Sequence, residues 1–165
     1  MDYSHSEFWQ DLKSGRFAVM IKESSRGQTV SNSTEVYNIL KPMIASNDDV
    51  EVLYGIFLNS KNRIIAIEKL FTGSIDQTAV YPREIVKKII GHKAAALIIA
   101  HNHPSGEMTP SSEDQAITMR IGLVLQAIGV PLHDHVIIGN GHHSMADSGW
   151  MENVRKRFGE MLIGC

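Results

Sequence analysis

The sequence predicts a mixed α/β domain in which helices flank a central mixed sheet. Two observations carry this prediction. Strand-like runs alternate with amphipathic helical runs, and the continuous apolar run 94–100 has the length of a strand that is buried on both faces. The chain has 165 residues, of which 43% are hydrophobic, so it is long enough to bury a core as one domain with a short extension.

The N-terminal part of the chain has a different pattern from the rest. Residues 1–28 are predicted to be an N-terminal extension, and residues 29–165 are predicted to be the domain. Phe8 and Trp9 are apolar, but Gly15 interrupts the pattern after a few residues. The sequence leaves open whether this extension docks on the domain or binds a partner.

The first half of the domain is predicted to contain one helix and a hairpin. A helix is expected over residues 34–44, with Ser31 or Ser33 as its N-cap. Two runs rich in β-forming residues follow, 50–58 and 63–71. The link between them is short and polar, which favours a β-hairpin.

The second half alternates helices and strands. Pro82 opens an amphipathic helix that Gly91 can close. The remaining elements are, in order, a buried strand, a Pro- and Gly-containing loop, a long helix, a strand and a helical tail: residues 94–100, 101–111, 112–128, 136–138 and about 150 onward.

The loop 101–111 is the best candidate for a site, because ligands commonly bind where a central strand of an α/β sheet ends. His101 and His103 are two residues apart, so in an extended segment their side chains point the same way. Two imidazoles on one side can bind one metal ion. The loop can bring Asp114, in the first turn of the next helix, to that ion. Two histidines and one carboxylate leave a fourth position of tetrahedral zinc open, which is typical of a catalytic site with one Zn²⁺ per chain.

A structural explanation of the same residues stays open. A His-x-His pair is weak evidence alone, and the chain has eight histidines. Ser111 and Asp114 also have the spacing of a capping box, which needs no metal. The combination of two histidines at a strand end with a carboxylate at a helix start favours the metal site.

These residues also carry a family resemblance. The run His-Asn-His-Pro-Ser-Gly at 101–106, with Ser111 and Asp114, resembles the JAMM metallopeptidase motif at every position. The segments 81–84 and 134–139 resemble the RadC-like branch of that family in particular, and the resemblance covers roughly residues 30–150. It implies a JAMM (MPN) fold with the three-layer architecture of cytidine deaminases.

The resemblance also implies roles for individual residues. His101, His103 and Asp114 are expected to bind zinc, and Ser111 is expected to donate a hydrogen bond to the developing oxyanion. A glutamate upstream of the motif is expected to activate the zinc-bound water.

A general base must lie within about 2.6–3.2 Å of the proton it accepts. Glu51 is the predicted base, because it begins the first core strand and matches the family position. Glu68 on the partner strand is its main competitor, and Glu84 on the following helix is a weaker one.

Three further histidines receive weaker predictions. His135 matches a family position near the last strand, and we expect it behind the metal ligands or in the packing. His142 and His143 lie in a Gly/Asn-containing loop and are predicted to be exposed to solvent.

The predicted function is that of a zinc-dependent metallopeptidase or isopeptidase, acting on a peptide or an isopeptide-linked protein. The alternative is a non-catalytic DNA repair or recombination accessory that binds nucleic acid or a protein partner. A formal net charge of −2, and the absence of room for the N-terminal helix-hairpin-helix region of longer relatives, predict little direct binding of nucleic acid. The oligomeric state is open.

Other zinc and nuclease chemistries do not match. The HNH nuclease motif spreads its residues over a ββα unit and is not a tripeptide. Zinc deaminases need a pair of cysteines, and the single cysteine here is Cys165. The absence of a signal peptide and of an apolar run of membrane-spanning length predicts a cytoplasmic protein without membrane contact.

Overall fold

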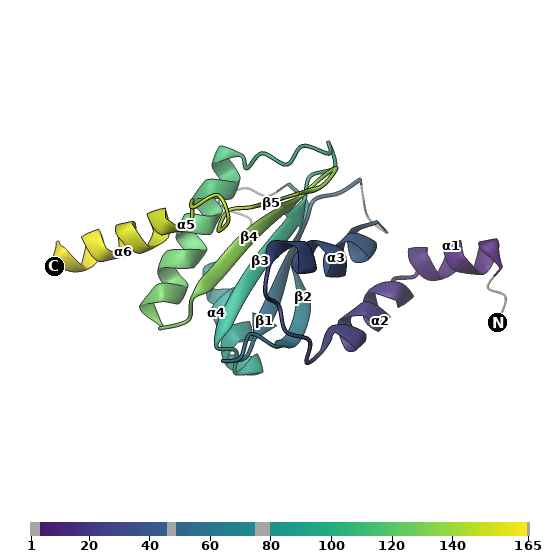
Figure 1. The fold of residues 1–165 in the computed structure, drawn as a ribbon, viewed down its shortest axis with the longest axis horizontal. Helices are drawn as coiled ribbons and strands as arrows, with labels where there is room; N and C mark the ends of the chain where they lie inside the picture. The colour runs from purple at the N-terminus through teal and green to yellow at the C-terminus, as the bar shows by residue number, and fades with distance from the viewer. Residues whose placement is uncertain (1–3, 46–48, 75–79, 165) are drawn as a thin grey trace.

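The computed structural model describes residues 4–45, 49–74 and 80–164. Within these ranges five strands form one sheet in the order β2-β1-β3-β4-β5 (Figure 1). The strands β3 and β4 run parallel, and the other neighbouring pairs are antiparallel. The strands are β1 (Val52–Leu58), β2 (Ile64–Thr72), β3 (Ala96–Asn102), β4 (Leu132–Ile138) and β5 (His142–Ser144). The helices are α1 (His5–Lys13), α2 (Arg16–Ser25), α3 (Ser33–Ile44), α4 (Pro82–His92), α5 (Ser112–Ala127) and α6 (Glu152–Ile163).

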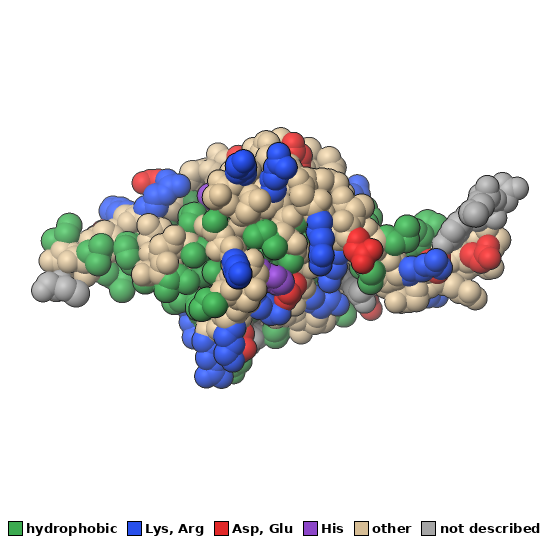
Figure 2. Space-filling model, turned by 90° about the horizontal axis from the view of Figure 1, so that it is seen from below, with side chains coloured by type: hydrophobic (Ala, Val, Ile, Leu, Met, Phe, Trp, Pro, Cys, Tyr) green, Lys and Arg blue, Asp and Glu red, His purple; other side chains and the backbone are tan. Residues whose placement is uncertain are grey.

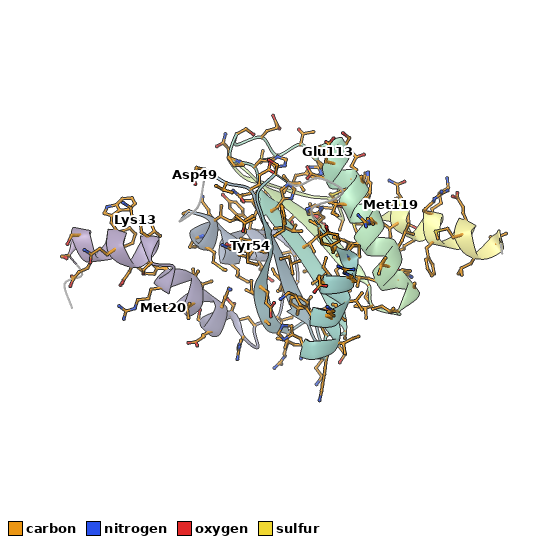
Figure 3. The ribbon with its side chains drawn as sticks, turned by 180° about the vertical axis from the view of Figure 1, so that it is seen from behind. Lys13, Met20, Asp49, Tyr54, Glu113 and Met119 are labelled. Atoms are coloured by element: carbon orange, nitrogen blue, oxygen red, sulfur yellow. The ribbon has the colours of Figure 1, made fainter. Side chains whose placement is uncertain are left out.

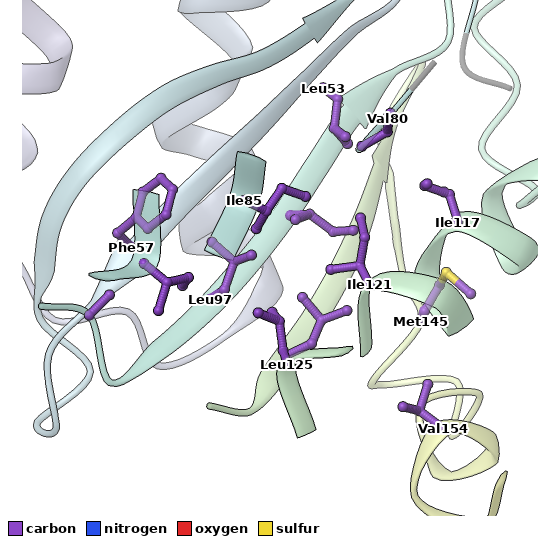
Figure 4. Close-up of a cluster of buried hydrophobic side chains, with 14 of the residues drawn as sticks. Leu53, Phe57, Val80, Ile85, Leu97, Ile117, Ile121, Leu125, Met145 and Val154 are labelled. Atoms are coloured by element: carbon purple, nitrogen blue, oxygen red, sulfur yellow. The ribbon is translucent and has the colours of Figure 1, made fainter. Parts of the chain in front are cut away.

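The sheet is the middle of three layers. All seven residues of β3 are buried, as expected for a continuous apolar run at the centre of a sheet. Leu97, labelled in Figure 4, and Ile99 belong to the core cluster on the side of the sheet that α4 and α5 cover. Ile98 and Ala100 point to the opposite face, where α3 covers the sheet. The predicted mixed α/β class and its three layers are confirmed.

The strand β3 lies two residues later than predicted. It pairs with β1 from Ala96 opposite Leu58 to His101 opposite Leu53. His101 and Asn102 are therefore in the strand, and the loop begins at His103. The hydrogen bonds of the sheet fix the boundary, whereas the apolar run alone does not mark it.

Several other boundaries differ from the predictions for local reasons. The N-cap of α3 is Asn32, whose side chain accepts a hydrogen bond from the backbone of Glu35, so neither predicted serine has this role. The helix α4 continues past Gly91 and ends before Lys93, which has a left-handed backbone conformation with φ of 54°. The strand β4 begins at Leu132, four residues earlier than predicted.

The terminal helices project from opposite ends of the molecule (Figures 1 and 2). The helix α1 contacts α2, and α2 contacts α3 and β2. The N-terminal extension therefore has contacts with the sheet and its covering helix, while the division at residue 28 stays a prediction. In the described ranges no helix is both long and apolar enough to cross a membrane.

Candidate metal centre

The side chains of His101, His103 and Asp114 converge at the C-terminal end of β3. The Nε2 atom of His101 lies 2.8 Å from the Nε2 atom of His103 and 3.0 Å from Oδ1 of Asp114. The Nε2 atom of His103 lies 3.3 Å from Oδ2 of Asp114. In the described part of the chain, these side chains form the one group of three or more His, Cys, Asp or Glu residues that could hold a metal ion.

The spacing of these atoms is close to that required by a small tetrahedral cation. Nitrogen and oxygen ligands about 2.0–2.1 Å from zinc are about 3.3–3.4 Å apart at tetrahedral angles. The three pairs here are 2.8, 3.0 and 3.3 Å apart, so two of them would separate slightly around an ion. His101 and Asp114 are buried, and His103 is partly buried beside the cleft. An ion held by these three side chains would be shielded by the protein on one side and would face the cleft on the other.

The second nitrogen of each histidine ring is bound within the protein. The Nδ1 atom of His103 lies 3.0 Å from the carbonyl oxygen of Glu107, which can only accept, so this nitrogen carries the hydrogen. The Nδ1 atom of His101 lies 2.8 Å from Nε2 of the buried His135. When each Nδ1 carries the hydrogen, both Nε2 atoms turn lone pairs toward Asp114, so the three groups can share either an added proton or a metal ion.

The electrostatics of the group also favour a cation. Burial opposes ionisation of Asp114, but hydrogen bonds from His101 and His103 outweigh it and hold its pKa far below the usual range. The hydrogen bond with Asp114 raises the pKa of His103, although burial acts against this shift. The charge of Glu51 contributes to the same increase in the pKa of His103.

The loop that carries His103 is held against the end of β4. The backbone N–H of His103 donates to Ile138, and the N–H of Asn140 donates to Gly106. Gly139 has no room for a side chain, because a Cβ atom there would lie 2.3 Å from the carbonyl oxygen of Gly106. This close approach of two backbones fixes the loop, and with it the ring of His103.

Glu51 and Ser111 line the same cleft as His103 and Asp114, and the cleft has a volume of about 760 Å³. Figure 3 shows Asp49 and Glu113, two further lining residues, at this end of the sheet. Ser111 is the N-cap of α5 and forms a capping box with Asp114. The Oγ atom of Ser111 accepts from the N–H of Asp114 at 3.0 Å, so its own hydrogen is not used by the cap. The capping role and the expected role toward an oxyanion are therefore compatible.

The structure gives Asn102 a role that was not predicted. Its buried side chain accepts a hydrogen bond from the N–H of Val52 at 2.8 Å and donates one to the carbonyl of Val50 at 2.9 Å. These two residues flank Glu51. The amide therefore continues the pairing of β3 with β1 beyond the strand end and positions Glu51 beside the cleft. No local pattern signals this contact, since it joins residues fifty positions apart.

The competing residues lie elsewhere. Glu68 forms ion pairs with Lys88 and His92 of α4. Glu84 is paired with Arg83 and Lys87 on the outer surface of α4. Neither glutamate lines the cleft.

The prediction that His142 and His143 are solvent-exposed is wrong. Both are half-buried in β5, where they pair with Ile138 and Ile137. His142 stacks on Tyr37 of α3 with the ring centroids 5.0 Å apart. The Gly/Asn residues before them form a tight turn between two strands, which sequence alone did not distinguish from a longer loop.

Comparison with known proteins identifies the family of the chain. A family model described as the RadC-like JAB domain matches residues 30–150. The chain belongs to this family. A UPF0758 protein of Pseudomonas fluorescens (strain Pf0-1) is 42% identical over 132 residues, which are 79% of this chain and 59% of the relative. A UPF0758 protein of Thiobacillus denitrificans is 41% identical over 131 residues, 79% of this chain and 58% of the relative.

Membership of the RadC-like JAB family establishes the JAB (MPN) fold and confirms the predicted family. The chain spans about three fifths of the length of the curated relatives it matches. The matched region contains β1, the candidate metal-binding group and β4, so the whole candidate site lies inside the family domain.

Proposed function

We propose that this chain is a zinc-dependent hydrolase of amide bonds, a metallopeptidase or isopeptidase of the JAMM type. The observation that supports it most is the convergence of two Nε2 lone pairs and one carboxylate at the edge of a cleft. His101, His103 and Asp114 would hold the ion. Zinc, when bound, supplies a Lewis acid and lowers the pKa of a coordinated water to about 7.

Glu51 acts in this proposal as the general base and then as the general acid. Its carboxylate takes a proton from the attacking water while the oxygen of that water bonds to the amide carbon. The same proton passes to the departing nitrogen as the C–N bond breaks. The hydrogen bonds of Asn102 to either side of Glu51 limit the movement of this residue during both transfers.

Ser111 stabilises the negative charge that develops on the carbonyl oxygen. Ser111 lines the cleft and its oxygen caps α5 as an acceptor, so its hydroxyl hydrogen is available to a group in the cleft. The substrate class that we propose is a peptide or an isopeptide-linked protein, since an open cleft of this volume admits a polypeptide segment.

Metal content is the first test. Plasma mass spectrometry would be applied to the wild type and to a His101→Ala/His103→Ala variant, both purified without a metal-binding tag. We expect about one zinc per chain in the wild type and near none in the variant. Folded wild-type protein that takes up no zinc would overturn the proposal and favour a binding role without hydrolysis.

Turnover is the second test. A library of peptides and isopeptide-linked conjugates would be incubated with the zinc-loaded chain and with Glu51→Gln. We expect cleavage by the wild type only, with equal zinc in both proteins, because glutamine keeps the shape but cannot accept the proton. Equal cleavage by the two proteins would exclude Glu51 as the base.

A further inference from the structure

A buried histidine connects the two ends of the metal-binding group. His135, on β4, has no exposed surface. Its Nε2 atom lies 2.8 Å from Nδ1 of His101, and its Nδ1 atom lies 2.5 Å from Oγ1 of Thr118. Thr118, one turn after Asp114 on α5, donates its hydroxyl hydrogen to the backbone carbonyl of Asp114 at 2.5 Å. The chain of contacts thus begins at one expected ligand and ends at another.

The hydrogens in this series of contacts can be assigned from the chemistry of its last group, the carbonyl oxygen of Asp114. A carbonyl oxygen only accepts, so the single hydrogen of the Thr118 hydroxyl points to Asp114. Thr118 must then accept the hydrogen on Nδ1 of His135. A buried neutral ring with a hydrogen on Nδ1 offers a lone pair at Nε2, so His101 donates from its own Nδ1. The Nε2 atom of His101 is left as a lone pair.

We propose that His135 and Thr118 are positioning residues that hold His101 in the tautomer able to bind a metal. The inference rests on the proposed zinc site and adds what prepares it. We call the contacts from His101 through His135 and Thr118 to Asp114 the relay. It is present before any ion binds, because every contact in it lies within the protein. Thr118 lies on α5, as Asp114 does, and His135 lies on β4. The relay therefore also connects the helix that carries Asp114 to the sheet.

The test is tautomer assignment by two-bond ¹H–¹⁵N NMR on metal-free protein with ¹⁵N-labelled histidine. We expect hydrogens on Nδ1 of both His101 and His135 in the wild type. Thr118→Val removes the acceptor for His135, so His135 should carry its hydrogen on Nε2 and His101 should do the same. Zinc affinity, measured by chelator competition, should fall about 10- to 100-fold. Thr118→Ser keeps the hydroxyl and should restore both the tautomers and the affinity.

The two proposals fail in different ways. If Thr118→Val leaves the His101 tautomer and the zinc affinity unchanged in a folded protein, the relay is wrong and the zinc site stands. The expected tautomers in a wild type that binds no zinc would support the hydrogen assignment and overturn the metal site. If Thr118→Val and Thr118→Ser both lose zinc affinity while both keep the wild-type tautomers, Thr118 acts only through packing.

Discussion

Asp134 and His135 are neighbours on β4 but serve two different buried polar clusters. Asp134 points to the α3 side of the sheet, where it accepts hydrogen bonds from Ser144 Oγ at 2.5 Å and from the N–H of Ala146 at 2.8 Å. His135 points to the α5 side and contacts His101. Every contact in the first cluster joins a donor to an acceptor, whereas the second cluster ends in acceptors that face one another.

The first cluster is structural, whereas the second is a candidate binding site. Buried polar groups are normally satisfied within the protein, as Asp134 is. Burial raises the pKa of Asp134 despite the hydrogen bonds from Ser144 and Ala146. The pKa of Asp114 moves in the opposite direction, although this side chain is also buried. A carboxylate held in its charged form among histidine nitrogens is consistent with the proposed cation site.

The largest expected effect distinguishes the two carboxylates directly. Asp114→Asn and Asp134→Asn make the same chemical change, and in both cases the amide oxygen can keep the backbone hydrogen bond. A thousandfold excess of zinc over its dissociation constant stabilises a folded protein by about 4 kcal/mol. We expect the wild type and Asp134→Asn to gain this stability and Asp114→Asn to lose it.

Thermal unfolding with added zinc and with a chelator measures this difference. The chelated samples provide the baseline for each variant, so an intrinsic loss of stability cancels. A zinc-dependent shift in Asp114→Asn equal to that of the wild type would contradict the ligand assignment. A shift lost from Asp134→Asn would show that the two clusters are not independent.

A second prediction concerns the loop that holds His103. Gly139→Ala would place a methyl group 2.3 Å from the carbonyl oxygen of Gly106, so one of the two backbones must move. Overpacking of this kind costs about 1–3 kcal/mol. Movement of the loop would also displace the carbonyl of Glu107 that orients His103, so zinc affinity should fall along with the free energy of unfolding.

Gly91→Ala is the matched control for that substitution. Gly91 lies within α4, and an added Cβ atom there meets nothing within 4 Å. Alanine in a helix is favoured over glycine by about 0.5–1 kcal/mol, so this variant should be slightly more stable with unchanged zinc affinity. Equal behaviour of the two variants in urea unfolding would show that the contact between Gly139 and Gly106 is not restrictive.

The sequence predicted the local part of the site better than its surroundings. His101, His103 and Asp114 are close in sequence, and the extended strand end together with the helix start brings them together. The order of helices and strands follows from hydrophobic periodicity in the same way. The place of Glu51 came from the family resemblance, since no spacing rule connects it to residues fifty positions later.

The long-range contacts were beyond reach. The relay joins β3, β4 and α5, and the amide of Asn102 reaches across to β1. The half-buried state of His142 depends on Tyr37 of α3, more than a hundred residues away. Each contact depends on strand register and layer packing, which a single sequence does not specify.

The structural cluster around Asp134 should make the free energy of unfolding depend on pH. The pKa of Asp134 is raised in the folded state, so its stabilising contribution is complete below the unfolded pKa of about 3.9 and is lost as the pH rises through the folded pKa. Each unit of the increase corresponds to about 1.4 kcal/mol. Wild-type protein should therefore lose stability relative to Asp134→Asn between pH 4 and pH 7.

Urea unfolding of metal-free wild type and Asp134→Asn across this range measures the difference. Both proteins are kept in chelator so that metal binding adds no pH dependence of its own. The other carboxyl groups titrate alike in both proteins and cancel in the difference. A stability difference that stays constant with pH would mean that Asp134 has its ordinary pKa.

The smallest expected change in stability separates the two candidate bases. Glu68 is partly exposed and pairs with Lys88 and His92, and burial opposes the ion pairs that lower its pKa. Such pairs contribute less than about 1 kcal/mol, so Glu68→Gln should lower the free energy of unfolding by no more than that. Zinc content and turnover should both stay at the wild-type level, because Glu68 faces α4 and does not line the cleft.

Glu51→Gln should likewise change stability and zinc content little, yet it should abolish turnover. If Glu68→Gln abolished turnover instead, the base would act from the other side of the β1–β2 hairpin, and the role given to Asn102 would be lost with it.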